Sequence, residues 1–329
     1  MSPPEVRIGV IGFGTVGRSF IDVLARRRLA LEQSAHVRLT IAEIAVREPR
    51  SHDCTIAGAR VHNDAEQLAS NPDIDLVVEV SGAASAARWI QTALDRGAAV
   101  VTANKLALAT SVPLLEALAE RRPGLYCEAS VAAAVPIVRA LRDSLEGEEI
   151  RAIRGVLNGT TTHVLSSIER GHSFVGALAD ARHQGICEGD ARLDLSGADA
   201  AHKLAILCTL AWNTPLAADR VSVEGIGLPV EDSIRSAVAR NFRVRLVAVA
   251  TRRDGTVVAA VRPATLAADD PLATATGVAN VVEVDTALAG TLRWTGPGAG
   301  GPATASALLA DTLAAARWLA PARLQLVAA

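Results

Sequence analysis

Residues 6–17 read Val6-Arg7-Ile8-Gly9-Val10-Ile11-Gly12-Phe13-Gly14-Thr15-Val16-Gly17. The first half is rich in β-branched residues, which predicts a buried strand. The second half is the pattern G-x-G-x-x-G, and residues 15–28 place apolar side chains at helical spacing. A strand, a glycine turn and a helix in this order are typical of the first unit of a Rossmann-type sheet.

Each glycine of this turn has a separate role in such a fold. Gly12 permits the tight turn, Gly14 lets the backbone approach a pyrophosphate, and Gly17 lets the helix pack closely on the strand. Free N–H groups and the helix dipole then attract the phosphate charge. A glycine turn that binds nothing is the alternative, but the strand before it and the helix after it favour dinucleotide binding.

The first 110 residues alternate between short apolar runs and stretches with helical spacing. Continuous apolar strands require cover on both faces, and their alternation with helices predicts a doubly wound parallel α/β sheet. The expected strands are 6–11, 37–46, 74–80 and 99–102, and the expected helices are 15–28 and 84–96.

The pattern changes after about residue 130, where strands gather in clusters with helices between them, which predicts an α+β domain. We expect a first domain over 1–135, a second over 136–300 and a C-terminal segment over 301–329. The expected later elements are strands 150–157, 243–250, 257–261 and 280–284, and helices 174–184, 199–210 and 306–319.

Composition narrows the class of protein. The 329 residues are 50% apolar and 21% charged, with a formal net charge of −2. This length indicates two domains, and the apolar fraction excludes a disordered chain. The balanced charge argues against nucleic acid as a partner, and the apolar runs are too short for a membrane span. Four scattered cysteines without C-x-x-C spacing, and an N-terminus without a secretion signal, predict a cytoplasmic protein without a disulfide framework or zinc site.

The second expected strand ends in Ala45-Val46-Arg47-Glu48-Pro49-Arg50, where a Rossmann fold contacts the adenosine ribose. A carboxylate at this point binds the ribose 2′-hydroxyl of NAD, whereas arginine accommodates the 2′-phosphate of NADP. Arg47 and Arg50 are suited to hold a phosphate, although Glu48 lies between them. Exposed loop arginines are the alternative; we predict NADP as the cofactor, with NAD tolerated.

Residues 185–199 contain four carboxylates in a Gly-rich stretch just before an expected helix. Asp199 and Lys203 are four residues apart and share one face of that helix. An ordinary surface ion pair, worth about 0.3–0.5 kcal/mol, is the alternative interpretation. The density of acids in a turn nevertheless favours a site that binds a cationic substrate. The four carboxylates are Glu188, Asp190, Asp194 and Asp199.

A second lysine, Lys105, follows the expected strand 99–102. Ligands of doubly wound sheets bind at the carboxyl ends of the strands. Lys105 is therefore a second candidate for the site, and an ordinary surface lysine is the alternative.

Six segments together resemble the homoserine dehydrogenase family, and the likeness covers most of the chain. They occur in order and at sensible spacing, which is far more specific than any one of them. The segments are IGVIGFGTVG from Ile8, VVTANK ending at Lys105, EASVAAAVPIV from Glu128, GVLNGTTTHVLSSI from Gly155, EGDARLDLSGADAAHKLAIL from Glu188 and GPGAGGPATASALLAD from Gly296.

The resemblance implies an enzyme that interconverts L-homoserine and L-aspartate 4-semialdehyde with NAD(P)(H). Such enzymes are dimers whose second domain forms the intersubunit sheet, and their C-terminal helix packs back on the nucleotide domain. Larger relatives carry a regulatory domain or a fused kinase. We expect the core form without that domain here, and therefore no feedback control by threonine through it.

The resemblance also assigns roles within the site. Lys203 exchanges a proton with the substrate hydroxyl, and Lys105 lies across the site near the substrate oxygen and the nicotinamide. An ammonium group there stabilises the alkoxide that develops during hydride transfer, and carboxylates hold the ammonium of the substrate. The implied substrate-binding residues are Glu188, Asp199, Asp194, Asn158, Gly159 and Thr160.

Cofactor and metal positions follow from the same resemblance. It implies a structural sodium ion at the backbone of Glu128, Val131, Ala133 and Val135. The implied dinucleotide contacts are Gly12, Phe13, Gly14, Thr15, Val16, Gly17, Arg47, Arg50, Ser81, Ala103, Lys105, Gly300 and Thr304.

The chain departs from the family at several positions. Ala133-Ala134 replaces a Gly-Gly pair, Ala191 a proline, Ile186 a tyrosine, and Thr162-His163 an Asn-Tyr pair. The alanines bear on the sodium site, and Ile186 and His163 alter the polarity of the pocket. None of these changes removes a group needed for hydride or proton transfer.

Two other functions remain as alternatives. A related NAD(P)-dependent oxidoreductase would act on another small amino acid or semialdehyde, as the pocket changes suggest. A pseudoenzyme that senses NADP(H) would have no need for the lysines and carboxylates. Acylating semialdehyde dehydrogenase chemistry is disfavoured, because no cysteine has an evident activating setting.

Overall fold

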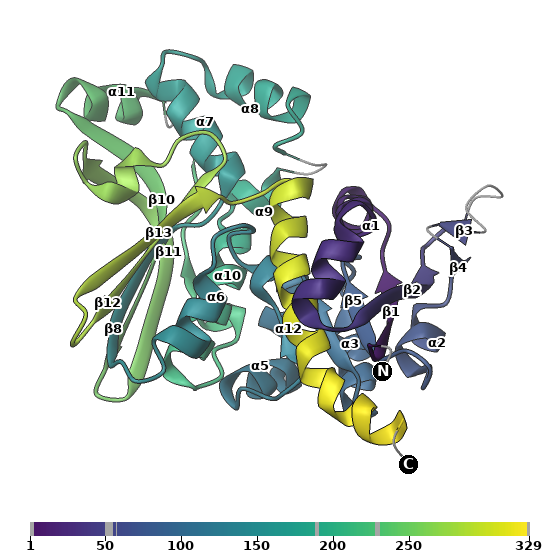
Figure 1. Ribbon diagram of the computed structural model, residues 1–329. Coiled ribbons are helices and arrows are strands. Elements are labelled where there is room, and N and C mark those ends of the chain that lie inside the picture. Colours follow the sequence, from purple (N-terminus) through teal and green to yellow (C-terminus); the bar gives the residue numbers. More distant parts are fainter. Residues whose placement is uncertain (1–2, 50–54, 57, 188–190, 228–230, 328–329) are drawn as a thin grey trace. The chain divides into compact units, whose positions relative to one another are not determined.

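The computed structural model describes residues 3–49, 55–56, 58–187, 191–227 and 231–327. The chain divides into two compact units: Met1–Ser130 with Gly301–Ala329 (unit 1), and Val131–Gly300 (unit 2). Each unit is built on its own sheet (Figure 1). Within the described ranges, no helix combines the length and apolar character needed to cross a membrane.

Unit 1 contains a seven-stranded sheet in the order β3-β4-β2-β1-β5-β6-β7. Its neighbouring strands are parallel apart from the antiparallel pair β3 and β4. From β1 the chain builds outward to β2 on one side and then to β5 on the other, which confirms the predicted doubly wound, Rossmann-type sheet. The strands are β1 (Glu5–Ile11), β2 (Arg38–Ala45), β3 (Thr55–Ile56), β4 (Ala59–His62), β5 (Leu76–Glu79), β6 (Ala99–Thr102) and β7 (Leu125–Tyr126).

Helices cover both faces of this sheet, which explains why its central strand β1 is buried without interruption from Ile8 to Ile11. Val6, Ile8 and Val10 of β1 belong to a core shared with α1 and α12, two helices that lie side by side (Figure 1). Gly9 faces the opposite way, where a Cβ would stand 2.6 Å from the Leu68 side chain of α2. The helices of unit 1 are α1 (Thr15–Ala35), α2 (Ala65–Ser70), α3 (Ala86–Asp95), α4 (Lys105–Thr110), α5 (Val112–Ala119) and α12 (Gly301–Val327).

Unit 2 contains a six-stranded mixed sheet in the order β13-β12-β8-β10-β11-β9. β9 and β11 are parallel, and the other described pairs are antiparallel. Helices α7, α10 and α11 pack against β10, so the predicted α+β character is confirmed. The elements are β8 (Ile150–Val156), β9 (Ser222–Val223), β10 (Phe242–Arg253), β11 (Thr256–Ala267), β12 (Ala279–Thr286), β13 (Thr291–Pro297), α6 (Ile137–Arg139), α7 (Gly159–Glu169), α8 (Phe174–His183), α9 (Arg192–Leu195), α10 (Ala198–Trp212) and α11 (Glu231–Ala239).

Six of these elements were not expected from the sequence: β9, β13, α6, α7, α9 and α11. The longer two with a clear physical reason are α7 and β13. Helix α7 opens with Gly159 and three threonines, which are poor helix formers. Every residue from Gly159 to Ile168 is nevertheless buried, so packing outweighs propensity there. Strand β13 ends in Gly296-Pro297, which reads as a loop. It lies at the edge of the sheet, where proline is tolerated.

Candidate functional site

The glycine turn after β1 has the geometry that its sequence predicts. Gly12 has φ +107°, and a Cβ there would stand 2.8 Å from the backbone of Ser81. A Cβ at Gly17 would overlap the carbonyl oxygen of Gly12, because α1 packs directly on the turn. Gly14 has no described atom within 4 Å on its Cβ side, and it precedes α1 without a side-chain cap. The open backbone and the uncapped helix start fit a phosphate group.

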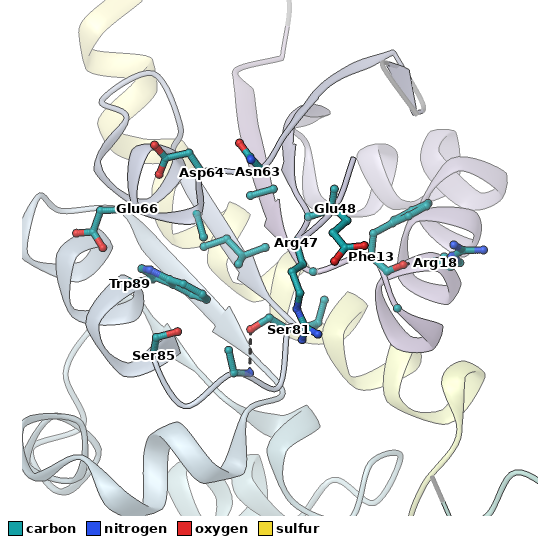
Figure 2. A pocket seen from close by; sticks show the side chains of 18 residues that line it. Phe13, Arg18, Arg47, Glu48, Asn63, Asp64, Glu66, Ser81, Ser85 and Trp89 are labelled. Carbon is teal, nitrogen blue, oxygen red and sulfur yellow. Dashed lines mark hydrogen bonds between the residues drawn. The ribbon is translucent and has the colours of Figure 1, made fainter. Parts of the chain in front are cut away.

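A cavity of about 810 Å³ extends from this turn. Figure 2 shows the side chains around it, which come from the glycine turn, the loops after β2, β4 and β5, and the starts of α2 and α3. The Arg18 guanidinium lies 5.0 Å from the centre of the Phe13 ring, and its Nε donates to the Phe13 carbonyl. The lining residues are Ile11, Gly12, Phe13, Gly14, Arg18, Ala45, Val46, Arg47, Glu48, Asn63, Asp64, Ala65, Glu66, Val80, Ser81, Ala83, Ser85 and Trp89.

Two carboxylates of the cavity wall have local structural partners. Asp64 caps α2 by accepting a hydrogen bond of 2.8 Å from the Gln67 backbone N–H. Glu66 pairs with Arg88 at 3.1 Å. Both groups therefore have a role in the fold of the wall, independent of any ligand.

Arg47 and Glu48, which the sequence assigns to the ribose end of a dinucleotide, both line the cavity. They follow β2, and Figure 2 shows both side chains among the groups around the cavity. Arg50, the second predicted phosphate ligand, lies outside the described residues. One predicted arginine is thus placed on the cavity, beside a carboxylate.

The other predicted dinucleotide contacts are distributed between the units. Thr15 and Val16 form the first turn of α1, Ser81 lines the cavity, and Ala103 follows β6. Thr304 is buried in the first turn of α12. Gly300 has φ +108° and is the last residue of unit 2.

Lys105 is the first residue of α4, and its neighbour Asn104 fixes the start of that helix. The Asn104 Oδ1 accepts a hydrogen bond of 3.0 Å from the Ala107 N–H, and its Nδ2 donates to the Ala83 carbonyl at 2.9 Å. Ala83 is part of the cavity wall. Lys105 is half-buried.

Unit 2 carries the second lysine site, on α10. The Lys203 Nζ lies 2.8 Å from Asp199 Oδ2 and donates a hydrogen bond of 2.7 Å to the Leu157 carbonyl. Lys203 and Asp199 are each only 8% exposed. The pair is therefore not the surface ion pair that the spacing alone allowed, and removal of one partner would leave a buried charge uncompensated.

Asn158 joins this lysine site to the acidic segment. Its Nδ2 donates hydrogen bonds to Asp194 Oδ1 (2.7 Å) and Asp199 Oδ2 (2.8 Å). Its Oδ1 accepts from the Thr161 N–H (2.8 Å) and caps α7, which fixes the orientation of the amide. The side chain thus holds two carboxylates beside Lys203.

The remaining predicted substrate residues lie at the start of α7 or outside the described part. Thr160 is buried, and its hydroxyl donates to the Ile186 carbonyl at 3.3 Å. A Cβ at Gly159 would stand 3.4 Å from the Val278 backbone, at van der Waals distance. Glu188 and Asp190 lie outside the described residues. Asn158, Asp194, Asp199 and Lys203 are brought together in unit 2, whereas Lys105 belongs to unit 1.

The residues predicted for a sodium ion lie on either side of the division between the units. Glu128 belongs to unit 1, and Val131, Ala133 and Val135 belong to unit 2. Ala132 and Ala133 have φ values of +55° and +45°, a left-handed conformation that favours glycine. Among the described residues, no group of three or more His, Cys, Asp or Glu side chains is arranged to hold a metal ion.

The departures from the family pattern near the site are all buried or half-buried. His163 Nε2 lies 2.9 Å from Asp180 Oδ2 on α8. Hydrogen bonds from Gln184 and then from His163 lower the pKa of Asp180 below its usual value. Ile186 is half-buried and Ala191 is buried. His163 therefore joins α7 to α8.

The described cysteines are buried thiols. Cys127, Cys187 and Cys208 are not in disulfides, and burial raises the pKa of the Cys208 thiol far above its usual value. A raised pKa disfavours the thiolate that acyl transfer requires.

Sequence reasoning missed one buried carboxylate, Glu79, at the carboxyl end of β5. It is fully buried and accepts hydrogen bonds from Ser81 and Thr102. The sequence does indicate Glu79, because it is the single acid at the carboxyl end of an apolar strand, where ligands of such sheets bind.

The Rossmann-type sheet, the phosphate cradle and the buried lysine–carboxylate cluster define a dinucleotide-binding oxidoreductase with a polar substrate site. Comparison with known families gives the particular one. The family model "Homoserine dehydrogenase, NAD binding domain" matches residues 12–127, and the model "Homoserine dehydrogenase" matches residues 136–313. The chain belongs to the homoserine dehydrogenase family, which confirms the resemblance seen in its motifs.

Relatives named homoserine dehydrogenase are similar in sequence along almost the whole chain. The homoserine dehydrogenase of Mycobacterium tuberculosis is 38% identical over 320 residues, which are 95% of this chain and 72% of that protein. The homoserine dehydrogenase of Pseudomonas aeruginosa is 34% identical over 309 residues, 93% of this chain and 71% of that protein.

Solved structures show the same architecture. The homoserine dehydrogenase of Thiobacillus denitrificans has a TM-score of 0.87 at 30% identity, over 97% of this chain and 74% of that one. A hyperthermophilic archaeal homoserine dehydrogenase in complex with NADPH has a TM-score of 0.79 at 29% identity, over 94% and 97% of the two chains. The chain is thus an NAD(P)-dependent oxidoreductase of the homoserine dehydrogenase type.

Proposed function

We propose that this chain catalyses the interconversion of L-homoserine and L-aspartate 4-semialdehyde, with NADP preferred and NAD accepted. The observation that carries the proposal is the position of Lys203. Two of its three N–H groups are directed at Leu157 O and Asp199 Oδ2. The remaining N–H is suited to the substrate oxygen, and NADP, when bound, supplies the hydride chemistry at the neighbouring carbon.

Lys203 then has two roles, and both act on the substrate oxygen. Its ammonium stabilises the negative charge that develops on the substrate oxygen. In the reductive direction it donates a proton to that oxygen as the aldehyde becomes an alcohol, and in the oxidative direction its nitrogen receives the proton. Asp199, 2.8 Å away, holds the lysine in place for both tasks.

The acidic residues bind the amino end of the substrate. Asp194 and Asp199 both accept hydrogen bonds from Asn158 Nδ2. The family resemblance assigns Glu188, which lies outside the described residues, to the same task. Carboxylates pair with the α-ammonium of homoserine and exclude substrates without one. Gly159 and Thr160 complete the pocket at the start of α7.

Lys105 acts from unit 1, near the substrate oxygen and the nicotinamide. Its support is structural: α4 starts at Lys105, and Asn104 ties that start to the cavity wall at Ala83. A second cation near the reacting oxygen strengthens the electrostatic stabilisation that Lys203 provides.

The preference for NADP rests on Arg47, which follows β2 on the cavity and is suited to the 2′-phosphate. The sequence adds Arg50, which lies outside the described residues, as a second candidate for this phosphate. Glu48 beside Arg47 can accept from the 2′-hydroxyl of NAD, so NAD is tolerated. The phosphate cradle of Gly12 to Gly17 is common to both cofactors.

As the family resemblance implies, we also propose a structural sodium ion whose ligands are backbone carbonyls of Glu128, Val131, Ala133 and Val135. Carbonyl oxygens are suitable ligands for a hard cation, and Val135 O keeps a lone pair although it accepts from the Ile137 N–H. Replacement of NaCl by choline chloride at equal ionic strength lowers the unfolding temperature if this ion is present. An equal unfolding temperature in both salts argues against it.

The working form is a homodimer in the cytoplasm, with the sheet of unit 2 at the interface, as the family resemblance implies. The buried cysteines Cys127, Cys187 and Cys208 are thiols outside any disulfide, which is compatible with a reducing compartment. Sedimentation velocity gives the assembly state, and a single species with the mass of one chain would contradict the dimer.

The main test is substrate turnover. NADPH oxidation is measured with L-aspartate 4-semialdehyde and with a panel of other aldehydes and 2-keto acids. Turnover on aspartate semialdehyde supports the proposal, and turnover only on another compound favours the related oxidoreductase. NADPH binding without any turnover favours the sensing pseudoenzyme.

A further inference from the structure

Glu79 is a buried carboxylate to which the proposed reaction assigns no task. It is the last residue of β5 and is 0% exposed. Its Oε1 accepts hydrogen bonds from the Ser81 N–H (2.8 Å) and the Ser81 hydroxyl (2.6 Å). Its Oε2 accepts from the Thr102 hydroxyl (2.8 Å), at the end of the next strand β6. One carboxylate therefore joins the ends of two neighbouring strands.

The hydrogen bonds continue from both ends and close a ring. On one side, the Ser81 hydroxyl accepts from the Ala83 N–H at 3.1 Å. On the other side, the Thr102 hydroxyl accepts from the Asn104 N–H at 3.0 Å. The Asn104 Nδ2 then donates to the Ala83 carbonyl at 2.9 Å, which completes the ring. The loop after β5 and the loop after β6 are fixed to each other through Glu79.

Both loops carry or adjoin residues of the proposed cofactor and catalytic sites of unit 1. Ser81 and Ala83 line the dinucleotide cavity, and the backbone of Ser81 lies directly against Gly12 of the phosphate cradle. Asn104 caps α4, whose first residue is Lys105. A displacement of the ring would therefore move the cofactor wall and the start of α4 together.

A carboxylate at this buried position would destabilise the fold through its desolvation if its role were only to fill space. Burial raises the pKa of Glu79 above its usual value, and the bonds from Ser81, Thr102 and Asn104 lower it only in part. An apolar side chain in the same volume would carry no desolvation cost. A carboxylate, in contrast, accepts from several donors in fixed directions.

We propose that Glu79 is a positioning residue that holds the cofactor-binding loop after β5 and the Lys105 helix in one fixed arrangement, so that cofactor binding and the placement of Lys105 depend on the same side chain. This inference rests on the proposed function, because it takes Lys105 to act at the reacting oxygen. It adds a residue that contacts neither substrate nor cofactor in its own right.

Three variants separate the connections. Glu79→Leu removes the acceptors on both sides of the ring. Thr102→Val is nearly isosteric and removes only the connection toward Asn104 and Lys105. Asp75→Asn is the matched control. Asp75 flanks the amino end of the same strand, is 9% exposed, and accepts from the Arg7 N–H at 2.8 Å, away from the carboxyl ends where the ligand binds.

The measurements are kcat, the KM of each substrate, the Kd of NADPH by fluorescence, and the unfolding temperature. We expect Glu79→Leu to lower kcat about a hundredfold, because a displacement of about 1 Å in a reacting group has an effect of that size. We also expect it to weaken NADPH binding. Thr102→Val lowers kcat and leaves the Kd of NADPH unchanged. Asp75→Asn lowers only the unfolding temperature.

A double-mutant cycle with Lys105→Ala tests whether Glu79 acts through Lys105. If it does, Glu79→Leu or Thr102→Val added to Lys105→Ala produces little further loss of kcat, because the interaction is already absent. Full additivity in the cycle overturns the proposal. It is also overturned if Glu79→Leu retains the kcat and NADPH affinity of Asp75→Asn. If Glu79→Leu does not fold, the Thr102→Val cycle decides.

The outcome is distinguishable from a failure of the proposed function. If the wild-type chain does not turn over homoserine or aspartate semialdehyde, the proposed function fails and the catalytic part of this inference fails with it. The proposed effect of Glu79 on cofactor binding is then still tested by comparing the Kd of NADPH between Glu79→Leu and Asp75→Asn. If the wild type is active and the cycle is additive, only the positioning role of Glu79 is wrong.

Discussion

The ammonium of Lys203 lies 2.8 Å from the Asp199 carboxylate one turn earlier on α10, and both residues are almost entirely buried. Burial separates this pair from the many surface pairs with the same spacing, because a buried charge without its partner is strongly destabilising. The pair is at once a support for the fold of the site and the group proposed to move the proton.

Replacement of Lys203 by alanine should abolish most turnover and leave the cofactor site intact. General acid–base assistance contributes about 10²- to 10⁴-fold, so we expect kcat to fall by that order in Lys203→Ala. The Kd of NADPH, measured by fluorescence, should stay near the wild-type value, because the phosphate cradle belongs to unit 1. Near-wild-type turnover in this variant would refute the role of Lys203.

Arg47 should control the choice between the two cofactors. Loss of its charge-assisted hydrogen bonds to the 2′-phosphate is worth about 1.5–3 kcal/mol, so Arg47→Ala should raise the KM of NADP roughly tenfold or more and change the KM of NAD little. Glu48→Gln leaves the arginine in place and should change the KM of NAD rather than that of NADP, because Glu48 is the proposed acceptor for the 2′-hydroxyl. An unchanged preference for NADP in Arg47→Ala would remove this assignment.

Glycine at position 133 should stabilise unit 2. Ala133 has φ +45°, and an L-residue in the left-handed region costs about 1–2 kcal/mol. Part of that gain, about 0.4–1 kcal/mol, is offset by the greater freedom of glycine in the unfolded chain. We expect Ala133→Gly to raise the unfolding temperature by about 1–3 °C. The control is Ala134→Gly, whose position is outside the set of positive-φ residues and which should be destabilised.

The His163–Asp180 contact should make stability depend on pH. Hydrogen bonds from Gln184 and His163 lower the pKa of Asp180 in the folded chain. A lowered folded pKa adds stability above the unfolded pKa, and this is lost as the pH falls through the folded value. Asp180→Asn should therefore be less stable than wild type at pH 7, and the difference should shrink below about pH 4. Urea unfolding at several pH values measures it, and a pH-independent difference would contradict the assignment.

Glu79 should show the opposite sign. Burial raises its pKa in the folded chain, so its contribution to stability is fully present below the unfolded pKa and is lost as the pH rises through the folded value. Relative to wild type, Glu79→Gln should therefore gain stability as the pH rises from about 4 to 8. The free energy of unfolding in urea gives this trend. A trend parallel to that of Asp180→Asn would show that the hydrogen bonds outweigh desolvation at Glu79.

The local sequence pattern predicted those elements whose conformation depends mainly on neighbouring residues. The strand 99–102 is observed as β6, and the glycine turn has the conformation expected for Gly12 and Gly17. In α7, by contrast, three threonines are helical because the whole segment is buried, and burial by distant elements is not visible in a short window.

The site shows the same division. The spacing of Asp199 and Lys203 predicted a shared helix face, but the ring formed by Ser81, Thr102 and Glu79 joins residues up to 23 positions apart and has no local signature. The role of Asn158 came from family resemblance alone, whereas Asp194 was also one of the four clustered carboxylates in residues 185–199. The contacts of Arg50 and Glu188 remain predictions.

The nucleotide-binding core is discontinuous in sequence, since Ala305, Leu308 and Ala315 of α12 pack in the same core as Val6 and Ile8 of β1. During synthesis the ribosome therefore releases the whole of unit 2 before the last pieces of that core emerge. The N-terminal part of unit 1 therefore cannot complete its core until α12 emerges. Until then, part of the apolar face of its sheet stays uncovered. Chaperone dependence at this stage of synthesis is the expected consequence.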